Sequence, residues 1–346
     1  MTRAAAGWLA ALGLTITLAG AAFGYPAASR QSTPPGYDAA STAILREGQA
    51  VAELVRAGDA DALVSRFSPQ LAQAVPKATV EQVLRTTLAS APIGPVIGES
   101  ALPAGQDRRI YLADHRWGAR KLALSVVLDR SGAIAGIDVS PRKALPRDPN
   151  AGRKLRASLR LPFRGEWWVF WGGHVERMNY HVIAPDQRHA YDFVAWGSGA
   201  THRGSGAANT DYWAWGRPVV APADGVVVSS ADGVRDNKPQ VEVENRRNPA
   251  GNHVVLDLGN GEFALLAHLR RGSVRVKPGQ RVRSGDLLGL CGNSGNSSEP
   301  HLHFHVQDRA TLFGRARGLP ITFRTYSLHG HRISRGTPVQ GQFIRP

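Results

Sequence analysis

The segment 300–306, Pro-His-Leu-His-Phe-His-Val, alternates imidazoles with apolar side chains. Successive side chains of a β-strand point to opposite faces, so His301, His303 and His305 share one face and the apolar residues share the other. The apolar face predicts packing into a sheet core. Three imidazoles in a row fill a sheet poorly, so we expect their face to meet water, a metal ion or each other. For His305, a solvent-facing or supporting role fits equally well.

The sequence around this segment predicts a β-rich domain. Residues 165–346 are a series of short apolar runs separated by Gly, Pro, Asn and Asp, which is typical of a mainly β fold. Eleven of the twelve histidines lie after residue 170, so any histidine chemistry belongs to this domain. Residues 197–212 are rich in Gly, Ser and Asn, which predicts a long surface loop that could border a groove.

The preceding part of the chain has a different pattern. Residues 38–91 repeat apolar positions at helical spacing, and alternating β-rich runs follow Gly94, so 38–140 is expected to be a small α+β domain. Thr79, with Gln82 three residues later, predicts a capping box at a helix start. Residues 141–164 are rich in Pro and Arg and predict a linker, or a strand that enters the next domain.

The first residues predict export. Residues 1–24 combine one Arg, an apolar run and small residues, as in a cleaved secretory signal peptide; an uncleaved anchor is the alternative. We therefore expect a periplasmic, extracellular or cell-wall protein without a stable membrane span after cleavage. Cys291 is the only cysteine, which excludes an intramolecular disulfide and fits a small buried thiol.

The charge balance favours anionic partners. The formal net charge is +15, from 42 basic and 27 acidic residues. The sequence has no zinc-finger, helix-turn-helix or aromatic RNA-binding signature, so we expect no nucleic-acid partner. For an exported protein, anionic cell-wall polymers are the better expectation.

A catalytic zinc site usually needs three protein ligands and one open position, so we looked for partners of the histidine strand. Asp192 stands between two aromatic residues, which are unusual neighbours for a solvent-exposed carboxylate. The segment around it, 179–197, predicts a hairpin with a turn at 184–187. In that hairpin His181 would share a face with Asp192, and we favour it over His189. A slip of one residue in the turn would reverse this choice.

The remaining histidines carry weaker signals. His268 ends an apolar strand, where a core role and a functional role are equally compatible with the sequence. His253 alternates with apolar residues and is expected at the surface or at a strand start. The others are expected to be structural or solvated: His115, His174, His202, His329 and His331.

Several stretches together resemble the lysostaphin-type zinc metallo-endopeptidases of bacterial cell walls. The resemblance runs from about residue 167 to 344 and is carried by the segments PVVAPADGVVV, GNHVVLDLG, ALLAHLRRGSVRVKPGQRVRSGDLLGLCGNSG and PHLHFHV, in the family's order. Several members of that family carry Glu where His305 stands. Residues 38–140 more loosely resemble small cystatin-like or nuclear-transport-factor-like modules.

The resemblance implies a two-sheet antiparallel β domain with a long groove, the duplicated hybrid motif. It implies Zn²⁺ held by His181, Asp192 and His303, with His268 and His301 as the catalytic pair. One departure is that most members place their first ligand histidine four residues before the Asp, where this chain has Arg188. That ligand must therefore come from His181 or His189.

The implied activity is that of an exported zinc metallo-endopeptidase that hydrolyses peptidoglycan stems or cross-bridges. An alternative is a catalytically inactive domain of the same fold that binds peptidoglycan or regulates a hydrolase. A third interpretation, a lipoyl- or biotin-carrier-like barrel, is suggested by the segment VKPGQRVRSGDLLGL, but no exposed Lys stands in a modification hairpin there. The sequence does not specify the bond cleaved or the oligomeric state.

Overall fold

The computed structural model describes residues 39–346 apart from 104–107, 143–144, 146, 174–175, 177, 199, 242–244, 246, 313 and 329. The expected signal peptide and the predictions for His174 and His329 lie outside the described residues. The described chain divides into two compact units, with the boundary near residue 145. None of the helices described is both long and apolar enough to cross a membrane.

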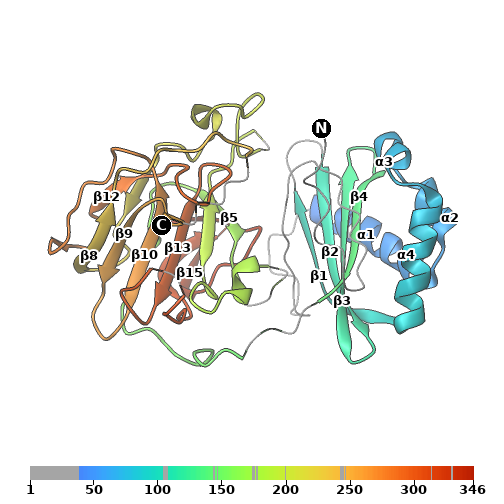
Figure 1. The fold of residues 1–346 in the computed structure, drawn as a ribbon, viewed down its shortest axis with the longest axis horizontal. Coiled ribbons are helices and arrows are strands. Elements are labelled where there is room, and N and C mark those ends of the chain that lie inside the picture. The colour runs from blue at the N-terminus through green and yellow to red at the C-terminus, as the bar shows by residue number, and fades with distance from the viewer. Residues whose placement is uncertain are drawn as a thin grey trace. The chain divides into compact units, whose positions relative to one another are not determined.

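The first unit packs four helices on a four-stranded sheet in the order β1-β2-β3-β4 (Figure 1). Helix α1 contacts β2 and β3, and the interface holds Val51, Val55, Tyr111 and Leu124. This is the small α+β fold that the sequence predicts. Its elements are α1 (Ala39–Ala57), α2 (Ala60–Ser65), α3 (Pro69–Ala74), α4 (Lys77–Ser90), β1 (Ile93–Pro103), β2 (Arg108–Trp117), β3 (Arg120–Asp129) and β4 (Ile134–Pro141).

Local capping sets the helix boundaries of this unit. Gly58, with a φ of +71°, follows the last residue of α1, and the side chain of Asp59 accepts a hydrogen bond from the Ala62 N–H to cap α2. The capping box expected at Thr79 is wrong, because α4 already begins at Lys77. Pro76 precedes it with a φ of −60°, and a proline leaves no N–H unsatisfied at a helix start.

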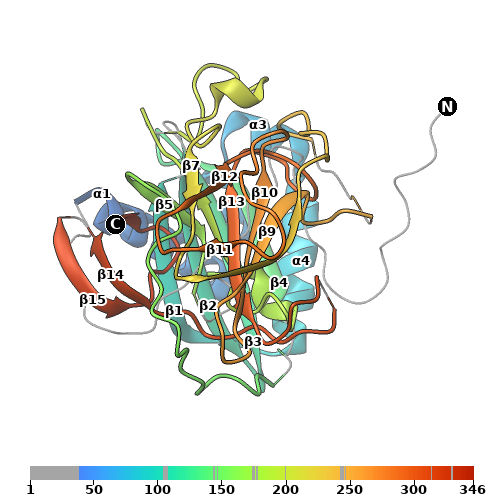
Figure 2. The same cartoon turned by 90° about the vertical axis from the view of Figure 1, so that its left-hand side faces the viewer.

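The second unit is mainly β, as predicted, and its strand pairings are antiparallel. Ten strands form one sheet in the order β11-β8-β9-β10-β13-β6-β5-β16-β14-β15, and β12 pairs with β7 in a second, small sheet (Figures 1 and 2). The elements are β5 (Trp167–Trp171), η1 (Tyr180–Ile183), β6 (Tyr191–Val194), η2 (Asn209–Asp211), β7 (Pro218–Val220), β8 (Gly225–Ala231), β9 (Asn252–Asp257), β10 (Phe263–Leu269), β11 (Arg281–Val282), β12 (Leu287–Leu290), β13 (Leu302–Gln307), β14 (Phe323–Leu328), β15 (His331–Gly336) and β16 (Phe343–Arg345).

Strand β13 lies inside the large sheet, between β10 and β6. Its apolar side chains Leu302, Phe304 and Val306 are fully buried in the core of the second unit. The opposite face, with His303 and His305, is buried as well. The imidazoles therefore meet other protein groups and not bulk water.

The segment before β5 contributes to the same core. Leu159, Leu161 and Phe163, which belong to the stretch 141–164, are fully buried in it. Just before them, the buried carboxylate of Glu262 accepts hydrogen bonds from the backbone N–H groups of residues 156 and 157, at 2.8 and 2.9 Å. The second unit is therefore anchored from the middle of this stretch onward.

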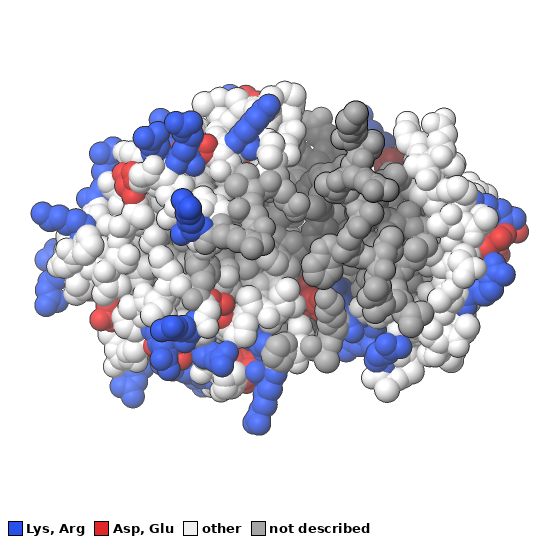
Figure 3. Space-filling view, viewed as in Figure 1, with Lys and Arg blue, Asp and Glu red and all other residues white. Residues whose placement is uncertain are grey.

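Basic side chains are spread over the visible face of the second unit, with a few acidic ones between them (Figure 3). They do not gather into a single patch on that face.

The packing predicts that Phe304→Ala lowers the free energy of unfolding of the second unit by about 3–5 kcal/mol, because a fully buried ring leaves a cavity. Leu287→Ala is the matched control, since that side chain is 40% exposed, and its cost should stay below about 1 kcal/mol. Urea unfolding followed by tryptophan fluorescence measures both. Equal losses for the two variants would contradict the assignment of Phe304 to the core.

Candidate metal centre

The register of β13 and β6 brings His303 beside Asp192. The two residues are Cα partners across the antiparallel pair, and His303 Nδ1 lies 2.9 Å from Asp192 Oδ1. Both side chains are buried. A carboxylate and an imidazole that are 111 positions apart in the sequence therefore meet in the middle of a sheet.

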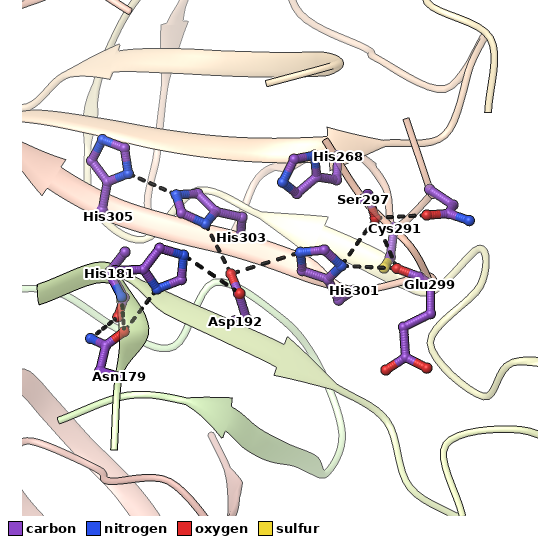
Figure 4. Close-up of polar contacts among 12 residues, drawn as sticks. Asn179, His181, Asp192, His268, Cys291, Ser297, Glu299, His301, His303 and His305 are labelled. Carbon is purple, nitrogen blue, oxygen red and sulfur yellow. Dashed lines mark hydrogen bonds and ion pairs between the residues drawn. The ribbon is translucent and has the colours of Figure 1, made fainter. Parts of the chain in front are cut away.

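His181 reaches the same carboxylate by a different route from the one expected. The hairpin predicted over 179–197 is wrong, because residues 180–183 form the 3-10 helix η1 and only 191–194 form a strand. The ring of Tyr180 packs on Trp171 at 5.1 Å, which supports η1 against β5. His181 Nε2 then lies 3.6 Å from Asp192 Oδ2 (Figure 4).

The free ring nitrogen of His181 fits a metal ligand. Asn179 Oδ1 lies 2.8 Å from His181 Nδ1, and the amide nitrogen of Asn179 donates to two backbone carbonyls. His181 Nδ1 must therefore carry the proton, which leaves a lone pair on Nε2. That Nε2 is buried and has no hydrogen-bond partner among the described residues, an arrangement that a cation would satisfy.

The electrostatics of His181 and Asp192 suit metal binding. Burial lowers the pKa of His181 to about 3, so the ring is neutral at pH 7. Burial alone would raise the pKa of Asp192, but His181, His301 and His303 hold it well below its usual value. One ligand atom from each of His181, Asp192 and His303 lies within 4.8 Å of the others, and two imidazoles with one carboxylate suit zinc.

His268 and His301 lie beside this group. Their ring centroids are 4.7 Å apart, His268 lies 5.7 Å from the His303 ring, and His301 Nε2 lies 3.7 Å from Asp192 Oδ1. The two Nδ1 atoms point to backbone carbonyls, of Ser294 at 2.7 Å and of Glu299 at 2.8 Å. Each Nδ1–H therefore donates to a carbonyl, and each Nε2 can accept a proton.

Backbone strain helps to place His268. It has a φ of +61°, which is unusual for a residue other than Gly, and the pairing of β10 with β9 shifts register between Leu266 and Leu269. Its buried ring has a pKa well below the usual value, first because of burial and then because of the two neighbouring imidazoles. His268 is therefore a neutral base at pH 7.

The other histidines do not join the group. His189, the competing candidate, lies 2.9 Å from the carboxylate of Asp148. His305 Nδ1 contacts His303 Nε2 at 2.9 Å, on the side of that ring away from Asp192, and burial lowers the pKa of His305 to about 3. His253 is the second residue of β9, in line with the expected strand start, but it is buried there and not at the surface, with its Nδ1 2.8 Å from the Gly251 carbonyl.

Of the remaining histidines, His115 is a buried structural residue and His331 is exposed, as expected, and the ring of His202 packs on Tyr212. Cys291 is a fully buried thiol whose pKa is raised by burial. That state agrees with the structural role expected for it and not with a nucleophile.

Four residues around the group escaped the sequence analysis. Asn179 and Gln307 hold histidine rings through their amide oxygens, and Ser294 and Glu299 do so through backbone carbonyls. Asn179, Glu299 and Gln307 each stand two positions from the histidine that they contact. A search for polar residues at that spacing could have found these three.

A family match covers part of this centre. Residues 207–313 match the model of Peptidase family M23, which is less than a third of the chain. The matched region includes His268, His301 and His303 and stops short of His181 and Asp192. The match agrees with the resemblance that the motifs of this region show.

Several curated proteins are similar to part of this chain. Peptidoglycan DD-endopeptidase ShyA of Vibrio cholerae is 37% identical over 91 residues, which are 26% of this chain and 17% of that protein. DD-carboxypeptidase/endopeptidase Mpg of Neisseria meningitidis is 34% identical over 87 residues, 25% of this chain and 18% of that protein. Cell division protein DipM of Caulobacter vibrioides is 33% identical over 103 residues, 30% and 16%. The chain thus spans less than a fifth of each relative.

Solved structures give weaker matches. The catalytic domain of lysostaphin from Staphylococcus simulans is 19% identical and covers 45% of this chain and 88% of that chain, with a TM-score of 0.27. A zinc-containing peptidase from Vibrio cholerae is 18% identical and covers 62% and 57%, with a TM-score of 0.24.

The geometry predicts that Asp192→Asn abolishes zinc binding, because the buried anion that joins the two ligand histidines is lost. The unaltered chain should retain about one zinc per molecule after loading and desalting, measured by elemental mass spectrometry. Asp186→Asn is the matched control, since Asp186 is also buried but accepts its hydrogen bond from the Gly314 N–H. Retention of a full zinc equivalent by Asp192→Asn would contradict the site.

Proposed function

We propose that this chain is an exported zinc metallo-endopeptidase that hydrolyses peptide bonds in the stems or cross-bridges of peptidoglycan. The observation that carries the proposal is the buried cluster of Asp192 with four imidazoles, in which His181 and His303 face the carboxylate. The M23 match and the relatives named as peptidoglycan endopeptidases support the substrate class.

In this proposal His181, Asp192 and His303 are the metal ligands. Bound zinc would polarise a peptide carbonyl and make water a nucleophile near neutral pH. His181 and His303 are neutral donors and Asp192 is the single anionic one, so the site would keep a net positive charge. The choice of His181 over His189 rests on the 3.6 Å approach to Asp192 and on the separate pairing of His189 with Asp148.

His268 and His301 would act as the catalytic pair. Each ring donates its Nδ1–H to a carbonyl and offers Nε2 towards the cluster, so either can take a proton from water and deliver it to the leaving amine. Once protonated at Nε2, the other ring can donate a hydrogen bond to the developing oxyanion. The carbonyls of Ser294 and Glu299 would stabilise the positive charge on these rings.

The rest of the chain would support this activity. We propose that residues 1–24 are a signal peptide, that 38–140 form a cystatin-like or nuclear-transport-factor-like module, and that 165–346 form the peptidase domain joined by 141–164. The basic surface would favour anionic cell-wall polymers near the substrate. With these features, the activity would lie in the periplasm, outside the cell or in the cell wall.

The proposal predicts that His268→Ala and His301→Ala each lower kcat by about 10²–10⁴-fold without loss of bound zinc, because each removes a proton-transfer group and not a ligand. The assay measures new amino termini released from purified sacculi, with and without a chelator. His331→Ala, which alters an exposed histidine of β15, is the control and should cleave normally.

Two results would overturn the assignment. Variants at 268 and 301 that cleave at the normal rate would exclude those histidines from the reaction. A zinc-loaded chain that binds sacculi without cleaving them, with binding unchanged by chelator, would identify the inactive, peptidoglycan-binding alternative.

A further inference from the structure

We propose that two buried side-chain amides, of Asn179 and Gln307, fix which ring nitrogen of each ligand histidine carries the proton, so that in the neutral ring the nitrogen facing Asp192 keeps its lone pair. Asn179 acts on His181 directly, and Gln307 acts on His303 through His305. The inference rests on the proposed function only in taking His181 and His303 as ligands. The three residues that it adds are positioning residues, since none of them contacts the carboxylate of Asp192.

The orientation of the Gln307 amide follows from its surroundings. Gln307 ends β13 and is buried, and its Nε2 lies 2.7 Å from the carbonyl oxygen of Arg309 and 2.6 Å from that of Thr311. Two carbonyl oxygens can only be satisfied by an NH₂ group. The amide oxygen Oε1 must therefore face His305, at 3.0 Å from its Nε2.

The orientation of the Gln307 amide determines which nitrogen carries the proton, first on His305 and then on His303. His305 Nε2 must donate to the amide oxygen, so in the neutral ring His305 Nδ1 is an acceptor. His303 Nε2 lies 2.9 Å from that acceptor and must donate to it. The nitrogen of His303 that remains is Nδ1, at 2.9 Å from Asp192 Oδ1. In the neutral ring it carries a lone pair, and a lone pair facing a carboxylate needs a cation between them.

Asn179 has the same arrangement at the other ligand. Its Nδ2 donates to the carbonyls of Gly173 and Ala190, at 3.2 and 2.9 Å, so its oxygen accepts from the backbone N–H and the Nδ1–H of His181. In both cases an amide held by two backbone carbonyls presents its oxygen to a histidine. In the neutral rings, the lone pairs of both ligands therefore face Asp192.

The opposite tautomers of the ligand histidines would lower the affinity for metal. An N–H on His181 Nε2 would point towards Asp192 Oδ2, 3.6 Å away, and would occupy the position where a metal should bind. The metal would then have to displace that proton and move it to the far side of the ring, where the acceptor would be missing. Loss of groups that orient metal ligands typically costs about 10- to 100-fold in affinity.

The direct test is the ring protonation pattern of the metal-free full chain, read by nitrogen-15 NMR of labelled histidines. The expected result is a proton on Nδ1 of His181 and on Nε2 of His305. The reverse assignment for either ring would overturn the proposal. This readout needs no metal, so a chain that binds no zinc would refute the proposed function and still decide the present inference.

Paired variants separate the tautomer effect from simple anchoring of the backbone. Gln307→Leu and Asn179→Leu remove the acceptor and should raise the zinc Kd by about 10- to 100-fold, measured by competition with a chromophoric chelator. Gln307→Glu and Asn179→Asp keep the acceptor oxygen while they lose the NH₂ anchor, and should stay within a few-fold of the unaltered chain. Gln342→Leu, which removes an amide bound to the Val339 N–H, controls for general loss of stability.

Each pair of variants also defines a result that would contradict the proposal. Equal losses of zinc affinity for the Leu variant and its acidic counterpart would show that only the anchor matters, and would overturn the proposal. His305→Leu should behave like Gln307→Leu, whereas His305→Glu, which restores an acceptor for His303 Nε2, should recover most of the affinity.

Discussion

The buried carboxylate of Asp192 is the constraint on which the candidate site depends. An isolated anion inside a β-sheet is strongly unfavourable, so it must be neutralised by partners that are themselves held in place. Here those partners are imidazoles from two separate parts of the chain: His181 from η1, and His301 and His303 from the segment at the start of β13. A divalent cation would satisfy the carboxylate and the lone pairs that face it together.

The fold positions His303 and His268 by different means. His303 is fixed by the register of β13 on β6, which the apolar side chains of β13 lock into the core. His268 needs a left-handed backbone conformation, an energetically unfavourable state of the order of 1–3 kcal/mol that the surrounding contacts must maintain. Its backbone N–H donates to Ala250 O and its ring donates to Ser294 O, so both ends of the residue are held. Strain and anchoring together aim this ring at the cluster.

The sequence analysis succeeded where local pattern decides structure and failed where packing does. The alternation at 301–306 predicted the two faces of β13, because a strand imposes that period on any sequence. The odd setting of Asp192 between aromatic residues also predicted a buried carboxylate. The path of residues 179–190 was predicted wrongly, because η1 packs against β5 through an edge-to-face contact of Tyr180 with Trp171, which no local pattern reveals. The strand start expected for His253 is confirmed, but a surface position is not, because residues 252–256 of β9 are all buried.

The chain of hydrogen bonds from Gln307 through His305 to His303 also affects the charge of the site. Several members of the family that the motifs resemble carry a carboxylate in place of His305. Such a carboxylate would accept the Nε2–H of His303 but would place a second negative charge beside that ligand. His305 and Gln307 supply the same acceptor without that charge. With two neutral imidazoles, Asp192 would be the single anion that a bound divalent cation meets, and the proposed site would keep a net positive charge. Because a more positive centre polarises a carbonyl more strongly, the neutral acceptor formed by His305 and Gln307 would favour Lewis acidity over tight electrostatic retention of the metal.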